Sequence, residues 1–342
     1  MTVVGVDENT LEDPHQGHGS SPLISLFALP KPFKGEARLI QENALSSWKQ
    51  LGNNVQIMLA GDDEGVEEAA CRYGTEYLGP VRRNERGTPY LDHLFELAHQ
   101  HARGDLLMYI NADILLFPNM LKVARQLMGR SIQEFLAIGR RWDLDVDLQV
   151  PEGQEAWDAW FEEFYSKGEW APMVCKDYFL FPRTLYRDVP EFLVGRGNWD
   201  NWMVHHAKSN KVPVIDLTEN VTVIHQNHGH GHSGGRLKAY VTGEEARHNE
   251  RVGQGRHLLS GAGADFELTP EGHLVSVASH WRFVRDLPRF CGLLKSFLQS
   301  LGSNQQKQIG SKVARLAWRQ RVGAAISNGL GSGQPQTGKN AT

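Results

Sequence analysis

The strongest constraint on how this chain folds is the alternation of short, mostly apolar segments with amphipathic helical ones. Apolar segments cover residues 23–29 (LISLFAL), 55–60 (VQIMLA) and 106–110 (LLMYI), and each runs into a turn that contains proline, glycine or asparagine. Between them, apolar residues return every three or four positions, as over 91–98. Strands that are apolar on both faces are typical of parallel sheets covered by helices on both sides. The sequence therefore predicts an α/β fold with a mostly parallel sheet flanked by helices.

The later elements are less regular, and the pattern weakens after residue 235. It predicts helices over 118–128, 154–165 and 200–208, strands over 135–139, 177–181, 212–217 and 221–225, and an acidic loop over 142–153. We expect a disordered leader over 1–22, one domain over 23–235, a helical C-terminal extension over 236–302 and a polar, partly disordered tail over 303–342.

The formal net charge of −4 is unevenly distributed along the chain. From Trp281 to the end there are ten Lys or Arg and a single acid, Asp286, for a charge of +9, so the first 280 residues carry −13. An acidic body argues against a general nucleic-acid binder. Residues 281–301 are predicted to form a basic amphipathic helix that either lies on an anionic membrane surface or docks on the main domain.

Cysteine usage and hydropathy indicate the compartment. The three cysteines lie far apart and form no CxxC motif, so neither a disulfide framework nor a cysteine zinc site is expected. Residues 1–20 contain no apolar run, and no stretch approaches the roughly 18 apolar residues that span a bilayer. We therefore expect a cytoplasmic protein, with peripheral contact to the inner face of a membrane through its basic segment as the alternative.

Polar residues follow the predicted strands at the edge where parallel sheets bind their ligands. Asn111, Ala112 and Asp113 come directly after the strand at 106–110. A carboxylate in this position either binds a divalent cation that bridges a diphosphate, or serves as an ordinary turn residue or helix cap.

A histidine-rich segment follows the predicted strand at 221–225. Its sequence, HQNHGHGH, places four histidines within eight residues, and the first two are His225 and His228. Imidazoles among glycines at a strand end are typical of metal or phosphate contact, and equally of a flexible polar loop. We expect one or two of the four to act as ligands.

The segment GRGNWDNW (195–202) combines a carboxylate with two tryptophans. Asp200 stands at the expected start of a helix, where it either caps free N–H groups or acts as a general base in a partly dry site. Trp199 and Trp202 either offer a flat platform to a sugar ring or pack in the core.

Three further polar groups have both a functional and a structural interpretation. Asp62 and Asp63 either accept hydrogen bonds from a base or ribose or are turn residues. The basic loop 82–87 (RRNERG) suits either a phosphate or a solvated surface. Lys176 and Asp177 precede a strand as a site pair or as a strand-edge ion pair.

Taken in order, these segments resemble the GT-A fold glycosyltransferases, and within them the family-2-like nucleotide-diphospho-sugar transferases. The resemblance covers residues 23–235 and rests on LISLFALPK, VQIMLAGDD, RRNERGTPYLDHLFELA, LLMYINADI, KDYFLFPR, GRGNWDNW and VIHQNHGHGH. It implies a Rossmann-like GT-A domain that transfers a sugar from a nucleotide-diphosphate donor to a hydroxyl of a glycan or other acceptor. A divalent cation, Mn²⁺ or Mg²⁺, is implied on the diphosphate.

The resemblance also implies roles for single residues. At the donor, Phe27, Ala28 and Lys31 would lie beside the nucleoside, Asp62 or Asp63 would face the base, and Asn84 and Gly87 would approach the donor. At the metal, Asn111, Ala112 and Asp113 would stand for the Asp-x-Asp motif, and His225 or His228 would complete the site. Asp200 would be the catalytic base. We expect Lys176, Asp177 and Trp199 at the substrate. The first Asp of the motif is Asn111 in this chain, which removes one carboxylate from the expected cation site.

Two other functions stay open beside the transferase. A catalytically inactive protein that binds nucleotide sugars or carbohydrate accords with Asn111. A nucleotidyltransferase on a related sheet would favour a glycine-rich phosphate loop after the first strand, where this chain has ALPKPFKGEA with one glycine.

Overall fold

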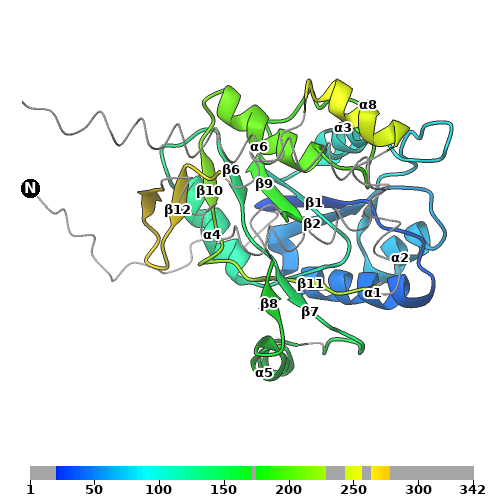
Figure 1. Ribbon diagram of the computed structural model, residues 1–342. Helices are drawn as coiled ribbons and strands as arrows, with labels where there is room; N and C mark the ends of the chain where they lie inside the picture. The colour runs from blue at the N-terminus through cyan, green and yellow to red at the C-terminus, as the bar shows by residue number, and fades with distance from the viewer. Residues whose placement is uncertain (1–20, 152, 172–174, 229–242, 256–262, 278–342) are drawn as a thin grey trace, which may run out of the picture.

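The computed structural model describes residues 21–151, 153–171, 175–228, 243–255 and 263–277 (Figure 1). Most of the predicted leader, the last two histidines of HQNHGHGH, the basic segment 281–301 and the polar tail lie outside the described residues.

The described chain alternates strands and helices as the apolar pattern predicted. The strands are β1 Ile24–Ala28, β2 Val55–Leu59, β3 Glu76–Tyr77, β4 Leu106–Ile110, β5 Ile114–Leu116, β6 Leu136–Ile138, β7 Trp142–Leu144, β8 Glu169–Trp170, β9 Tyr178–Pro182, β10 Val214–Asp216, β11 Val223–Gln226, β12 Phe266–Leu268 and β13 Leu274–Ser276. The helices are α1 Gly35–Lys49, the short 3-10 helix η1 Gly52–Asn54, α2 Val66–Tyr73, α3 Leu91–His101, α4 Asn119–Met128, α5 Gln154–Tyr165, α6 Trp199–Ser209 and α8 Glu244–Val252.

Nine strands form one large sheet in the order β13-β12-β10-β6-β9-β4-β1-β2-β3. Neighbours pair in parallel, except that β9 runs antiparallel to β4 and β6 and β13 antiparallel to β12. Ile24 of β1 lies opposite both Val55 of β2 and Leu106 of β4. The carboxyl ends of these three strands therefore meet at one edge. The predicted fold class, a mostly parallel sheet flanked by helices, is confirmed.

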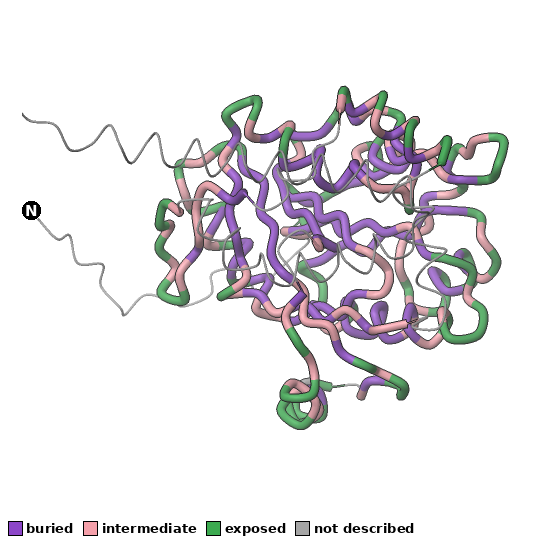
Figure 2. Tube along the Cα trace, viewed as in Figure 1, coloured by how far each residue is buried: buried purple, intermediate pink, exposed green. Residues whose placement is uncertain are grey.

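Helices cover both faces of the large sheet because its strands are apolar on both faces (Figure 1). Successive side chains of a strand point to opposite faces. Leu26 and Met108 pack on one face with α1, α2 and α4, and Phe27 and Tyr109 pack on the other with α3 and α6. Figure 2 shows the strands as a buried band between the more exposed helices and turns.

A second, four-stranded sheet in the order β5-β11-β7-β8 lies beside the large one. β11 pairs antiparallel with β5 and parallel with β7. Phe117, Trp157 and Ile224 form a separate small core through which α5 packs on this sheet. The chain passes from β4 in the large sheet to β5 in the small sheet through the three residues 111–113. The two sheets therefore meet at one of the predicted site segments.

The structure departs from the predicted elements at several short strands, two of which correct a stated expectation. The acidic loop predicted over 142–153 is wrong at its start, because Trp142–Leu144 forms β7, a strand too short to show a period. Residues 266–268, expected within the C-terminal extension, form β12 and pair with β10 in the large sheet.

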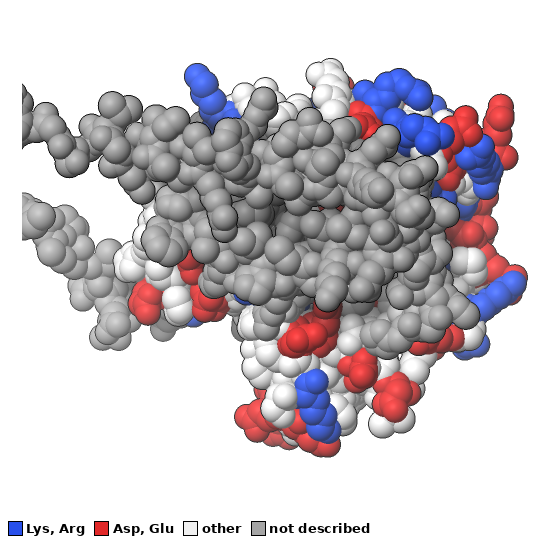
Figure 3. Space-filling model, in the orientation of Figure 1, with Lys and Arg blue, Asp and Glu red and all other residues white. Residues whose placement is uncertain are grey.

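Helix α5 places several acidic side chains on the surface, in line with the negative charge of the first 280 residues. The acidic residues Glu155, Asp158, Glu162 and Glu163 of α5 are exposed, and Figure 3 shows Asp and Glu side chains gathered over this lower part of the molecule. Among the described helices, none has the length and apolar character that crossing a membrane requires.

Candidate active site

Asp113 lies in the turn that joins the two sheets. The Ile114 N–H donates to the Asn111 carbonyl over 3.2 Å, and the Asn111 N–H donates to the Asp177 carbonyl over 2.9 Å, which ties the turn to β9. The Asp113 side chain is 16% exposed, and its Oδ1 is buried with no hydrogen-bond partner among the described residues. An unsatisfied buried carboxylate oxygen is costly, so this atom is suited to a positively charged ligand.

His225 and His228 face Asp113 from β11 and the residues after it. His225 is the register partner of Ile114, the residue after Asp113. Its Nε2 lies 3.9 Å from Asp113 Oδ2, and Nε2 of His228 lies 3.8 Å from the same oxygen. One ligand atom from each of the three residues lies within 4.8 Å of the others. The fold thus brings together two segments, 112 residues apart in sequence, that strand-end placement had predicted.

Each imidazole turns its Nε2 toward Asp113. His228 Nδ1 lies 3.0 Å from the Gln226 carbonyl oxygen, which only accepts, so Nδ1 carries the proton and Nε2 keeps its lone pair. His225 Nδ1 lies 3.1 Å from Asp143 Oδ1, although the angle falls short of a hydrogen bond. A carboxylate behind an imidazole fixes the ring orientation of metal ligands in proteins.

The donor set of Asp113, His225 and His228 fits a divalent cation. Carboxylate oxygen and imidazole nitrogen are both common ligands of divalent cations in proteins. Three protein ligands leave positions for diphosphate oxygens and water. Lys31 adds a positive charge beside them, since its Nζ lies 3.3 Å from His228 Nε2.

Asn111 is engaged by its neighbours and does not join that set. Its Nδ2 donates to Asp177 Oδ1 over 2.6 Å, and its Oδ1 accepts from the Tyr109 hydroxyl over 2.9 Å. Burial acts to raise the pKa of the Asp177 carboxyl, but the charges of Arg141 and His225 and the hydrogen bonds from Arg141 and Asn111 hold that pKa below its ordinary value. Asp177 is therefore an anion at neutral pH, and an Asp at position 111 would be repelled by it.

Asp200 lies inside the first turn of α6. The helix begins at Trp199 and Asn198 is its N-cap, so the interpretation of Asp200 as the cap is wrong. Asp200 is 8% exposed, and its Oδ1 accepts from the Asn201 N–H over 2.8 Å. Lys176 is 4% exposed. Burial lowers the pKa of its ammonium group, while the negative charge of Asp200 acts to raise it.

The hydroxyl of Tyr109 is close enough to Asp113, Asp177 and Asp200 to be affected by all three charges. Burial raises the pKa of its hydroxyl, and the negative charges of Asp113, Asp177 and Asp200 raise it further. Three carboxylates from separate segments of the chain thus act on one buried ring. The Trp199 ring packs against Tyr109 edge to face, at 5.2 Å between centroids.

Three residues expected at the ligands are core residues. Phe27 and Ala28 are fully buried, and the Phe27 ring packs on Phe95 at 5.1 Å between centroids. Trp199 is 6% exposed and contacts Tyr109 and Phe179. Their side chains offer little surface to a nucleoside or a sugar.

Asp62 and Asp63, which follow β2, are both paired with Arg83. The guanidinium Nε lies 3.0 Å from Asp62 Oδ1, and Nη2 lies 2.6 Å from Asp63 Oδ2. Arg83 Nη1 also donates to the Gly87 carbonyl over 2.8 Å. The pair and the loop therefore form one polar unit.

The Asn84 side chain shapes that loop from within. Its Oδ1 accepts from the N–H groups of Arg86 and Thr88, and its Nδ2 donates to Glu245 Oε1 over 2.7 Å. Gly87 has a φ of 78°, which a residue with a side chain adopts only under strain. Both residues thus act on the loop conformation.

Glu245 of α8 accepts hydrogen bonds from two loops, the one that contains Asn84 and Thr88 and the one that contains Arg196. It accepts from Asn84 and from Thr88 Oγ1, at 2.7 Å each, and from Arg196 Nη2 at 2.6 Å. Burial acts to raise the pKa of Glu245, but these hydrogen bonds and the charge of Arg196 lower it to about 2. The same helix supplies Asn249, which is fully buried and bonds both backbone groups of Leu193.

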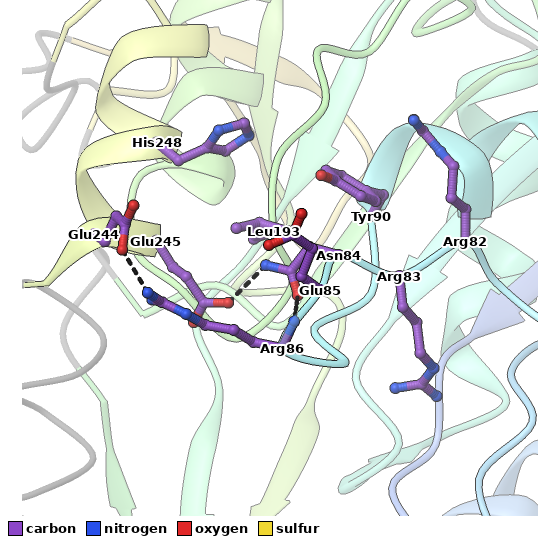
Figure 4. A pocket seen from close by; sticks show the side chains of 10 residues that line it. All are labelled: Arg82, Arg83, Asn84, Glu85, Arg86, Tyr90, Leu193, Glu244, Glu245 and His248. Carbon is purple, nitrogen blue, oxygen red and sulfur yellow. Dashed lines mark hydrogen bonds and ion pairs between the residues drawn. The ribbon is translucent and has the colours of Figure 1, made fainter.

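A pocket of about 480 Å³ opens between this loop and α8 (Figure 4). Two of the arginines that line it are neutralised within the protein. Arg86 pairs with Glu244, as the dashed line in Figure 4 shows, and Arg82 pairs with Asp92 and Glu191. The pocket therefore does not select an anion.

Sequence reasoning missed Arg141, Asp143, Glu245 and Asn249. Asp143 is the middle residue of the three-residue strand β7 and Arg141 directly precedes it, and the only sequence cue there is the alternation WDLDVD. Glu245 and Asn249 lie on α8, beyond the segments that resemble the transferases.

No family model and no curated protein sequence matches this chain. Among solved structures, it is similar to a mannosyltransferase from Pyrobaculum calidifontis in complex with GDP-Man and Mn²⁺, with 15% identity and a TM-score of 0.40, over 87% of this chain and 81% of that chain.

Two other similar structures are sugar–phosphoglycerate synthases. The glucosyl-3-phosphoglycerate synthase of Mycobacterium tuberculosis is 13% identical with a TM-score of 0.42, over 75% of this chain and 89% of that chain. The mannosyl-3-phosphoglycerate synthase of Rubrobacter xylanophilus is 20% identical with a TM-score of 0.38, over 75% and 86%. These are enzymes of the class that the sequence motifs resemble. At such scores they decide neither ligand nor mechanism, so the function is argued from the site.

Proposed function

We propose that this protein is a glycosyltransferase that moves a sugar from a nucleotide-diphosphate donor to an acceptor hydroxyl. The observation that carries the proposal is the convergence of Asp113, His225 and His228 where the β4–β5 turn meets β11. Ligands of α/β sheets bind at the carboxyl ends of the strands. A carboxylate and two imidazoles could hold a divalent cation, and that cation with Lys31 beside it would form a positively charged centre suited to a diphosphate.

The nucleoside end of the donor belongs at the end of β2. Asp62 and Asp63 follow this strand, and Arg83 holds them together. Carboxylates and a guanidinium side by side supply both acceptors and donors to a base or a ribose. We assign this unit to the nucleoside, with its own pairing loosened when the nucleoside binds.

Separate residues would neutralise the leaving diphosphate and remove the acceptor proton in the transfer step. A bound Mn²⁺ or Mg²⁺ would neutralise the negative charge that develops on the leaving diphosphate. Asp113, His225 and His228 would hold it, and Lys31 would donate to the phosphate oxygens. Asp200 takes the proton of the acceptor hydroxyl as the oxygen attacks the sugar, which implies inversion of the configuration.

The test of Asp200 compares turnover with binding. Asp200→Asn keeps the shape of the side chain and is expected to slow release of nucleoside diphosphate by ~10²–10⁴-fold, the usual contribution of a general base. Donor affinity is expected to stay unchanged, and the exposed Asp188→Asn serves as the control. Undiminished turnover in Asp200→Asn would refute its role. Donor binding without turnover in the wild type would favour the inactive binding protein.

The basic segment 281–301 supports a separate proposal, peripheral contact with anionic membrane. The test is flotation of the full chain with vesicles that contain anionic lipid. Replacement of Arg282, Arg285 and Arg289 by Glu is expected to abolish flotation. Equal partitioning of the two proteins would contradict the proposal.

A further inference from the structure

We propose that Arg141 is a positioning residue that sets the geometry of the cation site by holding Asp143 and Asp177 at the same time. Arg141 Nε donates to Asp143 Oδ1 over 2.7 Å, and Nη1 donates to Asp177 Oδ2 over 2.8 Å. The inference rests on the proposed function, because it concerns the same site. It assigns a residue that touches none of the three cation ligands.

On one side, Arg141 acts through Asp143 on His225. Asp143 of β7 is the register partner of His225 of β11, so the backbone itself places the two side by side. The same Asp143 oxygen that accepts from Arg141 lies 3.1 Å from His225 Nδ1. An anion at Nδ1 favours a proton there and leaves the lone pair on Nε2, the atom that faces Asp113.

On the other side, Arg141 acts through Asp177 on the turn that carries Asp113. Asp177 accepts from the Asn111 side chain over 2.6 Å, and its carbonyl accepts from the Asn111 N–H over 2.9 Å. Both bonds fix the first residue of the turn whose third residue is Asp113. Arg141 thus acts on His225 through one residue, Asp143, and on the turn of Asp113 through two, Asp177 and Asn111.

The two arms of this network belong to different sheets. Asp143 is part of β7 in the small sheet and Arg141 directly precedes it, whereas Asp177 directly precedes β9 of the large sheet. The guanidinium therefore links the sheets close to the turn that carries Asp113 and to His225 of β11. The pair is sheltered, with the side chains of Arg141 and Asp177 20% and 8% exposed.

The shape of the guanidinium matters as well as its charge. Its planar fork donates to two carboxylates in fixed directions, and a lysine ammonium keeps the charge without that geometry. Arg141→Lys therefore separates positioning from simple charge balance. Arg38→Lys, at an Arg–Glu42 pair on α1 with a 3.0 Å contact, is the matched control.

The first readout is Mn²⁺ affinity of the full-length protein, measured by titration calorimetry. Loss of groups behind a metal ligand typically costs about 10–100-fold in affinity, so Arg141→Lys is expected to weaken Mn²⁺ by that factor and Arg38→Lys to bind as the wild type. Asp143→Asn, a gentler change, is expected to weaken Mn²⁺ in the same direction and replaces Arg141→Lys if that variant does not fold. Affinity within twofold of the wild type in the folded variant overturns the proposal.

The second readout does not depend on metal. The ring-nitrogen NMR signals of His225 in the metal-free protein report which nitrogen carries the proton. The wild type is expected to show Nδ1–H, and the variant a shift toward Nε2–H. If the wild type takes up no Mn²⁺, the cation assignment of the proposed function fails, and these signals alone decide the role of Arg141: unchanged signals in the variant refute it.

Discussion

The side-chain amide of Asn111 donates to Asp177 Oδ1 over 2.6 Å, so the residue in place of the first Asp of the motif is a hydrogen-bond donor to a buried anion. A carboxylate at this position would have no proton to give. The hydrogen bond to Asp177 thus explains why this position departs from the Asp-x-Asp pattern. The negative charge that the pattern expects at position 111 is carried instead by its hydrogen-bond partner, Asp177.

Asn111→Asp, which restores the family motif, is expected to destabilise the protein. Two adjacent carboxylates repel, and the variant loses the bond to Asp177, for a cost of about 1–3 kcal/mol. The repulsion raises the folded-state pKa of the pair, so the loss is larger at pH 8 than at pH 5, where one carboxyl takes up a proton. Thermal unfolding at both pH values measures it.

The control for this change is Asn54→Asp, at an exposed residue that accepts from Arg125. Its stability is expected to stay near that of the wild type. The exchange Asn111→Asp with Asp177→Asn restores a donor and an acceptor and is expected to recover part of the loss. Equal stability of Asn111→Asp and the wild type at pH 8 would contradict the explanation.

Mn²⁺ is expected to raise the melting temperature of the wild type, because a ligand that binds only the folded state stabilises it by mass action. EDTA should reverse the rise. His225→Gln removes a ligand and is expected to lose more than ~10-fold in Mn²⁺ affinity, while His273→Gln, at an exposed histidine, keeps the full shift. A rise of the same size in both variants would exclude His225 as a ligand.

Lys31→Met is expected to have opposite effects on cation and donor. The Lys31 ammonium donates to His228 Nε2 and so occupies the lone pair that a cation needs. Removal of the ammonium group should therefore tighten Mn²⁺ binding by about two- to fivefold, the size of effect that an exposed charged group usually has. Donor binding in the presence of Mn²⁺ should weaken, since a phosphate partner is lost. Calorimetry measures both, and a change of the same sign in both would contradict the role of Lys31.

Glu245→Gln is expected to lower stability at neutral pH and much less in acid. The folded-state pKa of Glu245 is about 2, below its ordinary value. Its stabilisation is therefore complete above the ordinary pKa, near 4.5, and is lost as the pH falls toward 2. The lowered pKa corresponds to at most about 3 kcal/mol at pH 7, and solvent screening of this partly sheltered carboxylate reduces the expected loss to about 1–2 kcal/mol.

Denaturant unfolding of Glu245→Gln at pH 7 and pH 3 tests this dependence. Glu244→Gln, at the neighbouring exposed residue, is expected to cost little at either pH. A stability difference between the wild type and Glu245→Gln that does not shrink in acid would show that the carboxylate is not the source of the stabilisation.

Much of the fold is predictable because its strands are buried on both faces. An uninterrupted apolar run such as 106–110 marks β4, and the turn after it marks a site position without knowledge of the pairing. Asp113, His225 and His228 were predicted as candidate ligands in this way, and the structure brings them together.

What the sequence hides depends on contacts between distant short strands. β7 has three residues and β8 two, so neither shows a period, and the register that brings Asp143 beside His225 is fixed only by tertiary pairing. Arg141 was missed for that reason. Trp199 fits a sugar platform and a core position equally well by type, and only its contacts with Tyr109 and Phe179 decide for the core.

The central claim, a cation-assisted nucleotide-sugar transferase, is tested most directly by calorimetric titration of UDP- and GDP-sugars with and without Mn²⁺, in the wild type and in Asp113→Ala. The account predicts that at least one donor binds the wild type much more tightly with Mn²⁺, and that Asp113→Ala loses this gain. Donor binding that is the same with and without Mn²⁺, or the same in both proteins, would contradict it.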